Sequence, residues 1–141
     1  MTAQPSPADP LEVEIRVQAR PDTVFAFFVE PVRYVRWQGT RAELDPRPGG
    51  TYRVEMGPDQ GVVRGRFVEV DPPRRVVFTW GWEGNDEVPP GSSTVEVDLE
   101  PDGDDTIVRL RHTGLPSDRW RQVHLDGWEG FLARLRAAAG G

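Results

Sequence analysis

The chain has 141 residues and a formal net charge of −6, with 37% hydrophobic and 28% charged residues. This length and mixture suit one globular domain with a buried core, and the acidic balance disfavours nucleic acid, whose phosphates require basic partners. Cysteine is absent, so disulfides, thiolate catalysis and thiolate zinc sites are excluded.

The first ten residues predict a disordered tail, because residues 1–10 combine three prolines with no apolar cluster. They lack the basic start and apolar centre of a secretory signal. No apolar run approaches the ~18 residues that a membrane span requires. We therefore expect a cytoplasmic protein without membrane contact, with a single domain over residues 11–141.

The chain then indicates one strand and two short helices. Residues 11–17 alternate apolar and polar side chains, which is typical of a half-buried strand. Pro21 suits the first turn of a helix, and the apolar spacing that follows predicts a helix to about residue 30. A second short helix is expected over residues 32–37, ended by Gly39.

Six further strands are predicted from alternating segments separated by turn residues. They cover residues 40–44, 51–56, 62–70, 75–82, 93–99 and 106–112. Short strands with turns at intervals of roughly 8–12 residues indicate an antiparallel meander.

The last segment predicts an amphipathic helix of about twenty residues, with Ser117 as its N-cap. Its predicted apolar face consists of Trp120, Val123, His124, Gly127, Trp128, Phe131 and Leu135. This helix can cover the apolar face that a single sheet leaves open.

The residues expected to face the space between sheet and helix are unusually aromatic, and we predict that they line a ligand pocket. They are Phe28, Trp37, Phe67, Phe78, Trp80, Trp82, His112, Trp120, His124, Trp128 and Phe131. Bulky rings packed against one helix can leave a void in the ~300–1,000 Å³ range of small-ligand pockets. The alternative, that the same rings fill the core, stays open.

The two histidines are the candidate chemical groups. His124 lies on the apolar helix face, where it could act as a general base or bind a ligand. His112 ends an inward-facing strand, and the helix could bring the two rings close together. The simpler interpretation of each is a core histidine satisfied by a neighbour. No catalytic motif accompanies them, and two histidines are too few for a histidine-only metal cluster. The sequence therefore predicts no catalytic residue, no metal and no cofactor.

Four stretches carry a resemblance to a known family. They are residues 62–80, 21–25, 44–52, and 112–116 leading to 127–130. They resemble the SRPBCC (START-like) superfamily and, within it, the group named after the C-terminal domain of the activator of heat-shock protein 90 ATPase. The resemblance covers about residues 11–138. It implies an α+β helix-grip fold, in which a curved antiparallel sheet wraps around a long C-terminal helix.

Function is open to three hypotheses, because one fold hosts many functions. We expect a binder of a small hydrophobic or amphipathic molecule, held between the sheet and the C-terminal helix. The first alternative is a pocket enzyme of the cyclase, dehydratase or hydrolase kind that uses His124. The second is a protein-interaction module resembling a co-chaperone. The oligomeric state stays open.

Overall fold

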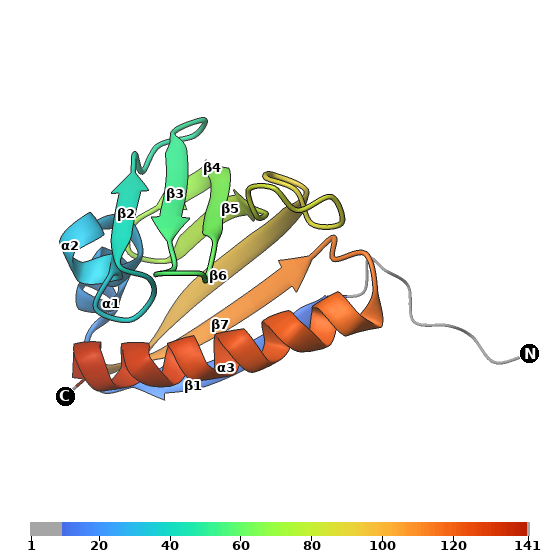
Figure 1. Ribbon diagram of the computed structural model, residues 1–141. Helices are drawn as coiled ribbons and strands as arrows, with labels where there is room; N and C mark the ends of the chain where they lie inside the picture. Colours follow the sequence, from blue (N-terminus) through green and yellow to red (C-terminus); the bar gives the residue numbers. More distant parts are fainter. Residues whose placement is uncertain (1–9, 141) are drawn as a thin grey trace, which may run out of the picture.

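The computed structural model describes residues 10–140, which form a seven-stranded antiparallel sheet, two short helices and one long helix (Figure 1). The strands are β1 (Leu11–Val17), β2 (Arg41–Leu44), β3 (Thr51–Glu55), β4 (Val62–Asp71), β5 (Arg75–Trp80), β6 (Ser93–Asp102) and β7 (Asp105–Thr113). The sheet order is β1-β7-β6-β5-β4-β3-β2, so the first strand joins the last and the rest follow as a meander. This confirms the predicted α+β fold. Most of the predicted tail, residues 1–9, lies outside the described residues.

Two short helices connect β1 to the meander. Both α1 (Pro21–Val29) and α2 (Pro31–Tyr34) begin with proline, whose fixed φ suits the first helical turn. α2 is shorter than predicted, ending at Tyr34 rather than at residue 37. The chain turns after it at Gly39, where φ is +78° and an added Cβ would lie 2.6 Å from Val54.

The sheet bends sharply in the middle of β4. The strand carries a β-bulge between Phe67 and Glu69, which increases local twist. At Gly65 the neighbouring strand comes so close that an added Cβ would lie 1.9 Å from the carbonyl oxygen of Thr79. The backbone N–H of Arg66 bonds the Thr79 hydroxyl at 2.9 Å instead of a backbone carbonyl. A glycine is therefore required where β4 and β5 make their closest approach.

The long helix α3 (Asp118–Gly140) lies along β1 and runs past the sheet's lower edge (Figure 1). Its buried residues are His124, Trp128, Leu132 and Leu135. The predicted apolar face is wrong at Val123, which is 51% exposed, and it omits Leu132, which is fully buried. The helix is rotated slightly about its axis relative to that expectation. No helix among residues 10–140 is long and apolar enough to cross a membrane.

Candidate functional site

The predicted pocket residues fall into a buried group and a group at the edge of the interior. Phe28, Trp37, Phe67, Phe78, Trp80, His112, His124 and Trp128 are buried, whereas Trp82, Trp120 and Phe131 are partly exposed. The buried rings pack directly on one another. Trp80 lies at their centre, 4.9 Å from Trp128 and 5.7 Å from His112 between ring centroids. The rings therefore fill most of the space in which the sequence predicted a pocket.

A buried polar cluster that the sequence analysis missed lies at the α2 end of this core. The hydroxyl of Tyr34 contacts both the hydroxyl of Tyr52 and the amide oxygen of Gln38. Burial raises the pKa of Tyr34 and of Tyr52, so both phenols stay neutral. Tyr52 also stacks on Phe78 with 4.1 Å between ring centroids. The spacing of four residues between Tyr34 and Gln38 was the one signal in the sequence for this cluster.

His124 is held between two tryptophans. Its Nδ1 lies 2.8 Å from the backbone carbonyl oxygen of Trp120, one helical turn earlier, and must donate there. Its Nε2 then accepts the indole N–H of Trp82 at 3.1 Å. Both ring nitrogens are occupied, and their bonds fix the neutral tautomer.

His112 has the opposite tautomer and a deeper position. Its Nδ1 accepts the indole N–H of Trp128 at 3.0 Å. Because indole only donates, the His112 proton is on Nε2, which donates to the Ser93 hydroxyl at 2.8 Å. Ser93 in turn donates to the Trp80 carbonyl oxygen at 2.9 Å. Every polar atom of this chain of bonds has a partner.

Both histidines are neutral at physiological pH. Burial lowers the pKa of His112 well below its ordinary value, and the neighbouring His124 lowers it further. Burial also lowers the pKa of His124, partly offset by the Trp120 carbonyl. The rings lie 5.2 Å apart between centroids, as the sequence had suggested. Neither has a free lone pair, so the arrangement matches the simpler interpretation of satisfied core histidines.

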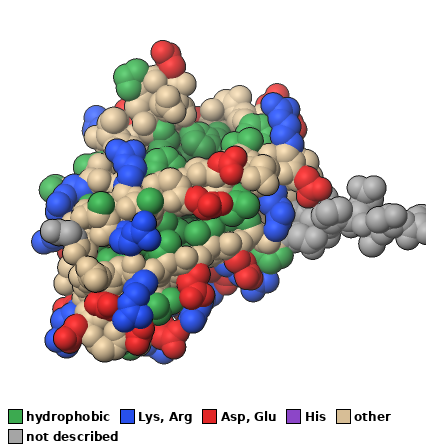
Figure 2. All heavy atoms as spheres, turned by 90° about the horizontal axis from the view of Figure 1, so that it is seen from below, with side chains coloured by type: hydrophobic (Ala, Val, Ile, Leu, Met, Phe, Trp, Pro, Cys, Tyr) green, Lys and Arg blue, Asp and Glu red, His purple; other side chains and the backbone are tan. Residues whose placement is uncertain are grey.

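An open hollow remains where α3 passes the turn between β3 and β4. This helix-side groove has a volume of about 390 Å³ and is lined by Gly39, Thr40, Met56, Gly57, Pro58, Gln60, Trp82, Phe131 and Arg134. On the face seen from below, hydrophobic side chains are visible between charged side chains of both signs (Figure 2). Arg134 is the only charged lining residue, and it has no ion pair among the described residues. The groove thus combines apolar side chains with polar groups, and Arg134 adds a cation to its lining.

A second hollow of about 360 Å³ continues from the groove along the loop after β5. The two share Gln60 and Trp82, and the second reaches Trp120. The Trp120 indole donates to Glu87 at 3.0 Å, which places this ring at the rim. Of the sequence-predicted residues, Trp82, Phe131 and Trp120 therefore line open space.

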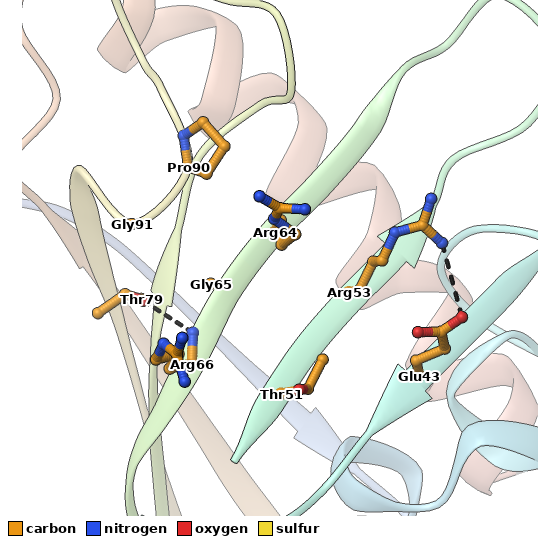
Figure 3. A pocket seen from close by; sticks show the side chains of 9 residues that line it. All are labelled: Glu43, Thr51, Arg53, Arg64, Gly65, Arg66, Thr79, Pro90 and Gly91. Atoms are coloured by element: carbon orange, nitrogen blue, oxygen red, sulfur yellow. Dashed lines mark hydrogen bonds and ion pairs between the residues drawn. The ribbon is translucent and has the colours of Figure 1, made fainter. Parts of the chain in front are cut away.

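A larger cleft lies on the opposite, outer face of the sheet and was not predicted (Figure 3). Its volume is about 700 Å³, and its lining is Glu43, Thr51, Arg53, Arg64, Gly65, Arg66, Thr79, Pro90 and Gly91. Arg53 and Arg64 oppose each other across β3 and β4, and both lie within 4 Å of Glu83. Acidic partners thus neutralise two of its three arginines, and the polar lining does not suit a hydrophobic ligand. No group of three potential metal ligands occurs within residues 10–140.

A curved sheet gripping one long helix, with an aromatic groove at their junction, defines a helix-grip protein. The chain belongs to the family described as "Activator of Hsp90 ATPase homolog 1-like protein", whose model matches residues 18–140. The solution structure of an AHSA1-like protein from Rhizobium etli is 40% identical, with a TM-score of 0.71 over 99% of this chain and 88% of that one. No curated protein matches.

Two further solved structures share the fold. CalU16 from Micromonospora echinospora is 27% identical, with a TM-score of 0.76 over 94% of this chain and 76% of that one. The Aha1 dimer from Colwellia psychrerythraea is 18% identical, with a TM-score of 0.79 over 94% of this chain and 96% of that one. The second likeness shows the fold alone.

Proposed function

We propose that this protein binds a small hydrophobic or amphipathic molecule in the helix-side groove, without catalysing a reaction. The observation that carries the proposal is an open hollow of about 390 Å³ with Trp82, Phe131 and Met56 in its lining. Its volume falls in the range of small-ligand sites, and a mostly apolar lining with few polar groups is their usual composition. Arg134 at the rim suits a ligand with a polar or anionic end.

The groove suits a hydrophobic ligand better than the packed interior and the outer-face cleft do. The interior behind it is occupied by packed rings, and the outer-face cleft is lined by charged and polar groups. The ligand is therefore expected at the mouth of the space between sheet and helix. A cytoplasmic location stays a prediction from the sequence.

Binding can be tested with 1-anilinonaphthalene-8-sulfonate, an amphipathic anion that fluoresces in apolar sites, followed by a thermal-shift screen of fatty acids, isoprenoids and polyketides. Phe131→Ala removes an aromatic wall of the groove and should weaken probe binding about tenfold, the size of a lost aromatic contact. Val123→Ala changes an exposed residue of the same helix that lies outside the groove. It should bind as the wild type does. Equal weakening in both variants, or no saturable binding, would contradict the proposal.

A co-chaperone role is the second candidate, favoured by the description of the matching family and by the Aha1 name of one similar structure. The exposed large hydrophobic residues Val32, Val68 and Val123 belong to three different elements, α2, β4 and α3. A purified Hsp90-type chaperone whose ATPase rate is unchanged by this protein would remove that candidate. The enzyme hypothesis gains nothing from His124, because both of its ring nitrogens already have partners.

A further inference from the structure

Four of the five tryptophans donate their indole N–H to an acceptor within the protein. The acceptors belong to Phe27 for Trp37, His124 for Trp82, Glu87 for Trp120 and His112 for Trp128. Trp80 is the exception. Its Nε1 is buried without a hydrogen-bond partner among the described residues, and the whole residue is only 2% exposed. A buried donor without an acceptor costs free energy, so this N–H favours any acceptor that can reach it.

The ring that carries the unpartnered N–H packs against a ring that lines the helix-side groove, although Trp80 itself does not line it. The ring of Trp80 is 5.8 Å from that of Trp82, which lines the groove, and 4.9 Å from that of Trp128. Trp128 in turn lies 6.4 Å from Phe131, the other aromatic wall. A ligand in the groove therefore reaches Trp80 only when the ring of Trp82 or Trp128 moves aside.

The surroundings of Trp80 decide the chemistry of the missing acceptor. The neighbouring rings are tryptophan, neutral histidine and the neutral phenol of Tyr52, and no cation is buried beside them among residues 10–140. An anion placed there would lose its hydration without a compensating charge, whereas a neutral carbonyl loses much less. The other two buried side-chain N–H groups without a partner, the amide of Gln38 and Nε of Arg121, are also donors. Among residues 10–140, every buried side-chain polar atom that lacks a partner is thus a donor.

We propose that the ligand carries a neutral carbonyl oxygen, as in a ketone, quinone, ester or lactone, which accepts a hydrogen bond from Trp80 Nε1. This inference rests on the proposed function, since it names the chemical class of the ligand in the helix-side groove. The apolar body of the ligand contacts Trp82 and Phe131, and its carbonyl points inward to Trp80. Any anionic end stays outside, beside Arg134.

The test uses two molecules of equal size, 2-acetylnaphthalene and 2-ethylnaphthalene, which differ in one carbonyl oxygen. The wild type should bind the ketone about tenfold more tightly, the order of one net hydrogen bond in a buried site. Trp80→Phe keeps an aromatic ring but removes the N–H, and it should bind both compounds with equal affinity. Trp120→Phe removes an indole that already has an acceptor, so it should keep the preference.

A second measurement applies even if Trp80→Phe fails to fold. In ¹H–¹⁵N spectra of the wild type, the ketone should shift the indole resonance of Trp80 downfield and the hydrocarbon should not. Equal affinities in the wild type, a preference that survives in Trp80→Phe, or an unmoved Trp80 resonance would each overturn the carbonyl inference. In those cases the proposed function stands. Absence of binding by both compounds and by the anilinonaphthalene probe would overturn the proposed function as well.

Discussion

Each histidine of this protein accepts a hydrogen bond from a tryptophan, and the two acceptors differ in their access to water. His112 is fully buried, and its partner Trp128 is buried with it. His124 lies nearer the surface, and its partner Trp82 is partly exposed in the groove. If the histidine is replaced, water can accept the indole N–H of Trp82 but not that of Trp128. Substitution should therefore be tolerated better at His124 than at His112.

Replacing each histidine by phenylalanine should reveal this difference. His112→Phe keeps an aromatic ring but leaves the Trp128 N–H buried without an acceptor, and should lower the free energy of unfolding by about 2–3 kcal/mol. His124→Phe exposes the Trp82 N–H to solvent in the groove and should cost about 1 kcal/mol or less. Urea denaturation measures both. Equal losses would contradict the assigned hydrogen-bond roles.

The sequence predicted which aromatic residues gather, but not how their polar atoms are paired. Alternation along β5 and β7 placed Trp80 and His112 on the inner face, which burial confirms. It could not predict that His112 accepts from Trp128, since that bond depends on the rotation of α3 against the sheet. The same rotation exposes Val123 and buries Leu132, contrary to the predicted apolar face. The apolar periodicity of the sequence therefore cannot predict which side chains of the candidate site are hydrogen-bonded to each other.

Glycines have two different roles in the secondary-structure elements. On β4, Gly65 allows β5 to approach so closely that any side chain would meet the backbone of Thr79. On α3, Gly130 has open space around its Cα, and a Cβ on Gly127 would meet only Phe131 at an ordinary 3.9 Å. The sequence analysis placed Gly127 on the apolar face, but no close packing there requires a glycine.

Alanine substitutions should separate these roles. Gly130→Ala should raise the free energy of unfolding by about 1 kcal/mol, because glycine is a weak helix former and nothing obstructs the new methyl group. Gly65→Ala should destabilise by about 3 kcal/mol or more, because β4 and β5 must move apart. Thermal unfolding should show a higher melting temperature for Gly130→Ala and a lower one for Gly65→Ala than for the wild type. A stable Gly65→Ala protein would show that this strand contact is not required.

The bounds of most strands followed from their alternation to within a few residues, and α2 did not. Its predicted end at Trp37 extended the helix across a segment where the chain turns inward and the Trp37 indole bonds the Phe27 carbonyl at 2.8 Å. A tertiary contact, not a local preference, decides that end. The helix-side groove could not be predicted from the alternation of apolar and polar residues either, because it arises where the curved sheet separates from α3.

At the scale of the whole molecule, the two buried neutral histidines link stability to pH. Unfolding exposes both rings and returns their pKa to about 6.5, whereas burial holds the pKa of each below that value in the folded protein. Below pH ~6.5 the histidines of the unfolded chain therefore bind protons, whereas those of the folded protein stay neutral. Stability is complete above that pH and is lost as the pH falls, with ~1.4 kcal/mol per pH unit for each proton.

The free energy of unfolding should accordingly fall between pH 7 and pH 5.5, by at most about 2.5 kcal/mol for the two protons. The two histidines of the chain carry the effect. In His124→Phe, one titrating group is gone and the loss should be about half as large. Urea denaturation at several pH values measures the slope. A flat profile would mean that the fold accommodates a charged imidazole, which the donated indole N–H groups on His112 Nδ1 and His124 Nε2 oppose.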